Sequence, residues 1–195
     1  MRIGLISDTY VPGQAMEVPP GVARAFEGVD LVLHAGNIFI PSVLDGLERI
    51  APVKATGNRR GNRSENPNYF EMECIGDPRV DGIQLLELEG HSIGMVHDLE
   101  LPGMSNDVMP GSIEKFLRPD QSLPLMVEKF FGRSLDIVVF GRTLYSMVEE
   151  HQGMLFVNPG SPSVPRNLRK LGSVAILELM PGRREARVID LASVS

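Results

Sequence analysis

The first third of the chain alternates short apolar runs with polar residues. The runs are mostly aliphatic, and each ends where the sequence turns polar. Short continuous runs of this kind are typical of strands that are buried on both faces of a parallel sheet. We therefore expect strands at residues 2–7, 30–34 and 52–55, with polar ends at Asp8, Asn37 and Asn58.

Helix-forming residues separate these strands. Residues 21–27 follow two prolines, and residues 41–50 place Val43, Leu44 and Leu47 at helical spacing. A proline suits the first turn of a helix, because the N–H that it lacks would have no partner there. The order strand, helix, strand, helix, strand predicts a parallel α/β sheet whose site lies at the carboxyl ends of the strands.

The second half of the chain changes to paired runs around tight turns. Each pair flanks a short segment that contains glycine, as β-hairpins do. Hairpins that follow strand–helix–strand units indicate two sheets packed face to face, so the predicted fold class is α/β, as a four-layer αββα sandwich. The expected pairs are residues 84–88 with 92–96, 144–149 with 154–157, and 174–179 with 186–191.

Two segments, residues 59–82 and 98–134, are longer than plain connections between these elements. The second contains a helix signal, since Ser122 precedes a run that ends with Phe131 and Gly132. This segment is interpreted either as an ordinary connection with one extra helix or as a lid or partner surface beside the site. Because long structureless loops are uncommon, we favour the ordinary connection, with its Met and Phe side chains in the core.

Composition narrows the class of protein. With 195 residues and 43% hydrophobic content, the chain is expected to form a single domain over residues 1–195. Its net charge of −6 lacks the basic footprint of nucleic-acid binding, and its N-terminal apolar run is too short for a signal or a membrane span. We expect a cytoplasmic protein with neither nucleic acid nor a membrane as its main partner. The one cysteine, Cys74, is interpreted as a half-buried strand residue.

Polar motifs follow five predicted strands in a fixed order. Together they resemble the calcineurin-like metallophosphoesterases, and in particular the small YfcE-like phosphodiesterase branch, over residues 1–166. The resemblance implies the αββα sandwich and a site in which two dications activate water and hold a phosphate. The motifs are Asp8-Thr9-Tyr10, Gly36-Asn37, Gly57-Asn58-Arg59-Arg60, His97-Asp98 and Gly141-Arg142-Thr143-Leu144, and Asn158-Pro159-Gly160-Ser161 closes the series.

The chain departs from the family pattern at four ligand positions. The family has histidine where this chain has Tyr10, Arg142 and Leu144, and a bridging aspartate where it has Asn37. The ligands that remain carry too little charge and too few imidazoles for a tight pair of divalent ions. We expect no catalytic residue and no tightly held cofactor, with weak binding of Mn²⁺, Mg²⁺ or Zn²⁺ left open. The vestigial metal ligands are Asp8, Asn37, Asn58 and His97.

Arginines occur in the region that the resemblance assigns to dications. Arg59, Arg142 and Arg166 are candidates for binding a phosphate-like anion, because guanidinium groups match phosphate oxygens in pairs. The alternative is that Arg142 pairs with Asp8 and neutralises a carboxylate that would otherwise be buried alone. The two interpretations are compatible if the ion pair opens to admit a ligand.

The chain has four histidines, and only His97 lies at a family ligand position. His34 lies just inside a predicted strand end, so we expect it to be packed or hydrogen-bonded. His91 and His151 lie in predicted hairpin turns, so we expect them to face solvent.

Two functions follow from the resemblance. The first is a phosphoesterase-family protein whose dinuclear metal centre is largely lost, which is catalytically impaired and binds a phosphorylated small molecule or a protein partner. The retromer subunit built on this fold implies that the scaffold can serve as an interaction module. The second is an active metal-dependent phosphodiesterase or phosphatase with an atypical ligand set. A purely structural, homo-oligomeric role is left open.

Overall fold

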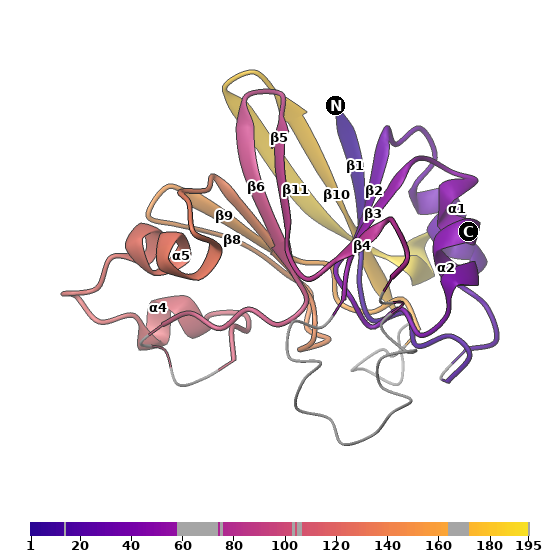
Figure 1. Cartoon of the computed structure of the whole chain (residues 1–195), viewed down its shortest axis with the longest axis horizontal. Helices are drawn as coiled ribbons and strands as arrows, with labels where there is room; N and C mark the ends of the chain where they lie inside the picture. Colours follow the sequence, from indigo (N-terminus) through magenta and orange to yellow (C-terminus); the bar gives the residue numbers. More distant parts are fainter. Residues whose placement is uncertain are drawn as a thin grey trace.

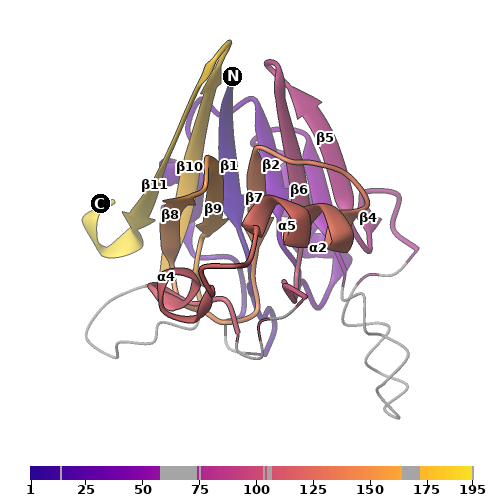
Figure 2. The same cartoon turned by 90° about the vertical axis from the view of Figure 1, so that its left-hand side faces the viewer.

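Two β-sheets pack face to face, and helices cover their outer sides (Figures 1 and 2). The computed structural model describes residues 1–13, 15–57, 74, 76–102, 104, 107–163 and 172–194. Apolar side chains from both sheets fill the space between them, among them Leu5, Leu33 and Val139. The predicted four-layer αββα sandwich is confirmed.

The first sheet combines the parallel N-terminal strands with the C-terminal hairpin. Its strand order is β11-β10-β1-β2-β3-β4, in which β1 to β4 run parallel and β10 runs antiparallel to β1. A helix follows each of the first two strands, and both begin with proline, as predicted. The elements are β1 Arg2–Ile6, α1 Pro20–Ala25, β2 Leu31–His34, α2 Pro41–Glu48, β3 Val53–Thr56, β4 Val80–Asp81, β10 Ser173–Met180 and β11 Arg183–Asp190, with a 3-10 turn at Leu191–Ser193.

The second sheet has the order β5-β6-β7-β9-β8, with β6, β7 and β9 parallel. Helices α4 and α5 lie on its outer side (Figure 2). Helix α5 begins after Ser122 and ends at Gly132, in left-handed conformation, as the sequence predicted. The elements are β5 Gln84–Leu88, β6 His91–Val96, α4 Ser112–Phe116, α5 Leu123–Phe131, β7 Ile137–Phe140, β8 Met147–His151 and β9 Met154–Asn158.

The long segment 98–134 packs onto the second sheet through a core of its own. Ile113, Val127 and Phe131 are buried there with residues of β7 and β9. Close packing is possible because β6 carries Gly94, where an added Cβ would lie 2.3 Å from Leu135 Cδ1. The described part therefore packs as a connection with Met126 and Phe131 buried as expected, but Met109 and Phe116 are 37% and 38% exposed, against the prediction. It also contains α4, a helix that was not predicted.

Four local predictions were wrong: the start of β8, the setting of Cys74, and the exposure of His91 and of His151. Strand β8 begins at Met147 rather than at residue 144, because the chain is still in a loop at Leu144. Cys74 is buried in a turn with φ 53°, not in a strand. His91 does not face solvent: it is 5% exposed, and its Nε2 lies 2.9 Å from the Met180 carbonyl, so it ties β6 to the turn between β10 and β11.

Three further findings concern the segment predicted at 59–82, His151 and the possibility of a membrane span. The segment predicted at 59–82 lies largely outside the described residues. His151 is partly buried and lies 2.8 Å from Glu149, which corrects its assignment to solvent. Among the described residues, no helix is long and apolar enough to cross a membrane.

Candidate functional site

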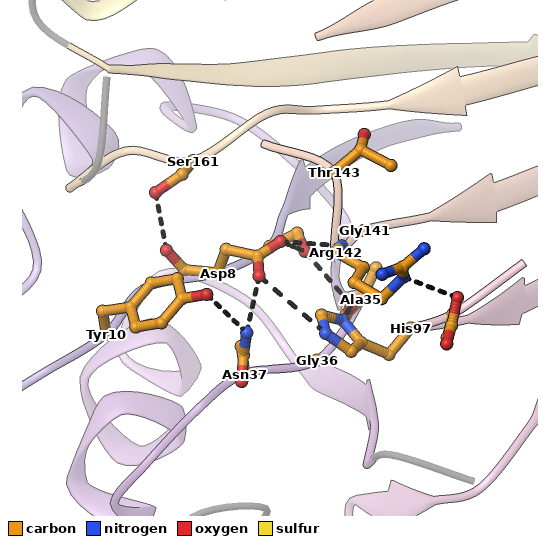
Figure 3. Close-up of polar contacts among 12 residues, drawn as sticks. Asp8, Tyr10, Ala35, Gly36, Asn37, His97, Gly141, Arg142, Thr143 and Ser161 are labelled. Atoms are coloured by element: carbon orange, nitrogen blue, oxygen red, sulfur yellow. Dashed lines mark hydrogen bonds and ion pairs between the residues drawn. The ribbon is translucent and has the colours of Figure 1, made fainter. Parts of the chain in front are cut away.

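Four of the predicted site residues meet where the strands of both sheets end (Figure 3). Asp8 follows β1 and Asn37 follows β2 in the first sheet, whereas His97 follows β6 and Arg142 follows β7 in the second. The carboxyl ends of these parallel strands lie at one rim, which is why residues far apart in sequence come together. Asn58, Arg59 and Arg166 lie outside the described residues.

The Asp8 carboxylate is the centre of the site and is fully buried. Its Oδ1 accepts a hydrogen bond from Asn37 Nδ2 at 2.8 Å. Its Oδ2 accepts from Ser7 Oγ at 2.5 Å and from the main-chain N–H of Arg142 at 3.0 Å. Burying a carboxylate costs little free energy only if hydrogen-bond donors replace the water that it loses. Asn37, Ser7 and the Arg142 N–H supply three such donors.

The Asn37 side chain lies between Asp8 and Tyr10 and is hydrogen-bonded to both. Its Nδ2 donates both to Asp8 Oδ1 and to the Tyr10 hydroxyl, at 2.8 and 2.9 Å. The amide group thus presents its partly positive hydrogens to the carboxylate (Figure 3). Tyr10 also packs against Phe39, with ring centroids 5.2 Å apart, which fixes the position of the phenol.

His97 faces Asp8 from the second sheet and is 2% exposed. Its Nδ1 lies 2.7 Å from the Ala35 carbonyl oxygen, so Nδ1 carries the proton and donates it. In the neutral ring Nε2 then keeps a lone pair, and it lies 3.9 Å from Asp8 Oδ1. A histidine oriented in this way by a carbonyl is a typical metal ligand or base.

The backbone of the site adopts left-handed conformations that non-glycine residues rarely take. In the first, second and fifth motifs, positive φ occurs at every position where the family resemblance implies a metal ligand. These residues are Asp8, Tyr10, Asn37, Arg142 and Leu144. Such conformations persist only when the surroundings enforce them, and they cluster at functional sites. Five of the nine non-glycine residues with positive φ among the described residues lie at these positions, which makes this rim the candidate functional site.

Two glycines allow the loops of the two sheets to touch. An added Cβ at Gly141 would lie 2.0 Å from Ser7 Oγ and 2.6 Å from the Ala35 carbonyl oxygen. An added Cβ at Gly36 would lie 2.5 Å from the His97 side chain. Both positions require glycine, because backbone and buried side chains cannot move away.

The Arg142 side chain turns away from Asp8. Its Nε lies 2.7 Å from Asp98 Oδ1, and its Nη2 pairs with Asp107. The interpretation of an Arg142–Asp8 ion pair was therefore wrong: the contact is made by the main-chain N–H of Arg142, not by its guanidinium. The sequence could not distinguish the two because it does not reveal the left-handed turn that directs the side chain outward.

The Asn-Pro-Gly-Ser segment braces the site. Asn158 Nδ2 donates to the Gly141 carbonyl and to Thr143 Oγ1, at 2.9 and 3.1 Å, and so holds the loop after β7. Ser161 Oγ donates to the Asp8 carbonyl at 2.6 Å. In the sequence this motif is recognisable only as a mark of the family, and the positioning role of both side chains was not predicted.

His34 is buried beside the site in its neutral form. Its Nδ1 accepts from the Gly36 N–H at 3.2 Å, so Nε2 carries the proton and donates to Thr9 Oγ1 at 3.2 Å. Burial, together with the nearby His97, lowers the pKa of His34 to about 3. The prediction that His34 is a packed, hydrogen-bonded residue is confirmed.

The donor set of the described residues does not fit two divalent ions. One carboxylate and one imidazole face each other, and the part of the chain that the structure describes contains no group of three His, Cys, Asp or Glu side chains able to hold a metal. Two adjacent dications need several anionic or imidazole ligands between them. The arrangement can instead hold a carboxylate, an amide and a phenol together by hydrogen bonds.

Comparisons with known proteins give a consistent result. A profile of the calcineurin-like phosphoesterase superfamily domain matches residues 1–181. A protein of Methanothermobacter thermautotrophicus named a "Probable metallophosphoesterase" is 32% identical over 191 residues, which cover 97% of this chain and 92% of that protein.

Solved structures share the fold at lower sequence identity. An archaeal phosphodiesterase superposes with a TM-score of 0.58 at 20% identity, covering 97% of this chain and all of the other (100%). Vps29 from Chaetomium thermophilum, in a complex with a cyclic peptide, superposes with a TM-score of 0.61 at 16% identity, covering 97% and 94%. At these identities the structural similarity supports the fold alone.

Proposed function

Because the chain belongs to the calcineurin-like phosphoesterase superfamily, we propose that it is a member in which hydrogen bonds replace the two-metal centre, and that it binds a partner instead of hydrolysing a phosphoester. One observation carries the proposal. Asn37 Nδ2 donates to both Asp8 and Tyr10, at 2.8 and 2.9 Å, so a neutral amide stands between groups that a cation would otherwise link.

Charge supports the same proposal. A pair of dications brings four positive charges. Of the buried carboxylates at the described rim, Asp98 already pairs with Arg142, which leaves Asp8 to balance them. Without an ion to lower its pKa, water is a poor nucleophile at neutral pH. Asp8, Asn37 and His97, with Asn58, are on this account remnants of a metal site, and none is assigned a catalytic role.

A protein partner is favoured over a phosphate-like anion. The Arg142 guanidinium already pairs with Asp98 and Asp107, so an anion would have to compete with two carboxylates. Arg59 and Arg166 remain candidates for an anion site. That Vps29 has been solved with a bound cyclic peptide agrees with a scaffold that can present binding surfaces.

A second candidate is a metal-dependent phosphodiesterase that uses an atypical ligand set. The observation in its favour is the lone pair of His97 Nε2, which faces Asp8 Oδ1 across 3.9 Å. Those two groups, with Asn37 and Asn58, would be the ones to hold an ion. An ion bound there would act as a Lewis acid on a phosphate oxygen.

Hydrolysis of bis-p-nitrophenyl phosphate in Mn²⁺ separates the two candidates. We expect the unmodified chain and His97→Ala to share one background rate. We also expect Tyr10→His, Asn37→Asp, Arg142→His and Leu144→His to gain activity only when they are combined, since each alone leaves too few ligands. Robust Mn²⁺-dependent turnover that His97→Ala abolishes would establish the second candidate.

A further inference from the structure

A hollow of about 370 Å³ lies on the outer helical layer of the second sheet. Figures 1 and 2 show α5 on the outside of this sheet, and α5 supplies half of the lining. The hollow shares no lining residue with the strand-end site. It is lined by Pro102, Gln121, Ser122, Leu125, Met126 and Lys129.

The hollow combines an exposed leucine with a buried methionine. Leu125 is 66% exposed, whereas Leu123 and Val127 on the same helix are 0% exposed. Met126, at 8% exposure, contributes a flexible apolar side chain that adapts to different shapes. Pro102, Leu125 and Met126 make half of the lining apolar, so a partner that covers the hollow would remove this apolar surface from water.

The charge of the hollow is complementary to a carboxylate. Lys129 is the one charged residue of the lining, and no acidic residue lines the hollow. Lys129, like the other described lysines, forms no ion pair among the described residues, so its ammonium group is available to a carboxylate of a partner. On a chain with net charge −6, this hollow is a local exception.

We propose that the hollow binds a short segment of a partner protein, which packs an aliphatic side chain against Leu125 and Met126 and places a carboxylate near Lys129. The proposal rests on the binding role inferred above and adds the chemistry of the partner. The wide mouth of the hollow favours a protein segment, because a small molecule usually needs a site that buries most of its surface. Gln121 and Ser122 add polar groups that can bond the backbone of such a segment.

A phage-displayed random peptide library, selected on the intact chain, tests the proposal. The expected result is enrichment of peptides that carry Asp or Glu within a few positions of Leu, Ile or Met. One enriched peptide, synthesised and titrated by calorimetry, should bind Leu125→Glu about tenfold or more weakly, as expected at the centre of a contact. Lys129→Glu should weaken it several-fold and reduce the salt dependence of binding.

Lys115→Glu is the matched control, since Lys115 is also an exposed lysine of the outer helical layer but does not line the hollow. Its affinity should stay within about twofold of the parent, and all three variants should melt near the parent because the positions are exposed. Enriched peptides without an acidic residue, equal binding to Leu125→Glu, or no enrichment at all would overturn the proposal. So would a dimer in sedimentation that Leu125→Glu dissociates, because the occupant would then be a second copy. The hydrolysis assay reports separately on the proposed function, since neither substitution touches the strand-end site.

Discussion

Asn37→Asp is the substitution that tests the site most sharply. It places a second carboxylate where Asn37 Nδ2 now lies 2.8 Å from Asp8 Oδ1. Two full charges at that separation repel by about 6 kcal/mol at an effective dielectric constant near 20. The protein can avoid this repulsion by protonating one of the two carboxyl groups. Whichever costs less free energy, the repulsion or the protonation, sets the loss of stability.

The expected loss depends on pH in a defined direction. Two close carboxylates raise the pKa of the pair above the unfolded value of about 3.9, so the folded variant binds a proton that the unfolded chain lacks. Binding that proton costs about 5.5 kcal/mol at pH 8 and about 1.5 kcal/mol at pH 5. Stability of the variant should therefore rise as the pH falls, by about 1.4 kcal/mol per unit. Allowing for relaxation, we expect a loss of roughly 2–5 kcal/mol at pH 8.

Urea denaturation followed by circular dichroism at pH 8 and pH 5 measures both values. Asn37→Ala is the control: it removes the donor without adding a charge, so it should cost about 1–3 kcal/mol at both pH values. If Asn37→Asp were as stable as the parent at pH 8 in metal-free buffer, Asp8 and Asn37 would not be in contact, and the reasoning would be refuted.

Three further predictions concern groups around Asp8. His34→Gln should flatten the pH dependence of stability. As the pH falls from the unfolded pKa of about 6.5 to the folded pKa of about 3, the unfolded chain binds a proton that the buried His34 does not, so the parent loses about 1.4 kcal/mol of stability per pH unit. Urea titrations with the same pH dependence for both proteins would contradict this. Gly141→Ala should cost at least about 2 kcal/mol, since its Cβ would lie 2.0 Å from Ser7 Oγ. Gly46→Ala is its control, with nothing within 4 Å, and should gain about 0.5–1 kcal/mol in thermal melts. Arg142→Ala should cost only about 1–2 kcal/mol of stability, because the guanidinium is 39% exposed and the main-chain hydrogen bond to Asp8 remains. A loss as large as that of Asn37→Asp would indicate that the guanidinium pairs with Asp8 after all.

The sequence predicted the architecture because that depends on local signals that add up. Apolar runs with polar ends, prolines before helices and glycines in turns each point to the same sandwich, and tertiary packing reinforces them. Helix α5 was predicted at both ends because its caps are local. Helix α4 was not, because its five residues are stabilised by burial of Ile113 rather than by a cap signal.

Side-chain directions at the site could not be predicted in the same way. The motif order placed Asp8, Asn37 and His97 at one rim, because strand ends are fixed by the fold. Whether Arg142 faces Asp8 or Asp98 depends on one left-handed residue, whose conformation no pattern of hydrophobicity encodes. His91 was misplaced for a related reason: its partners, the carbonyls of Met180 and Arg183, lie in a distant hairpin.

If hydrogen bonds occupy the place of the two-metal centre, no pair of ions should bind at the strand-end site. Anomalous diffraction at the manganese edge, from crystals grown in millimolar Mn²⁺, measures this. Asn37 Nδ2 should stay within hydrogen-bond distance of Asp8 Oδ1 and the Tyr10 hydroxyl, with no pair of anomalous peaks between them. Two manganese peaks a few Å apart, with Asn37 turned to place its oxygen between them, would contradict it.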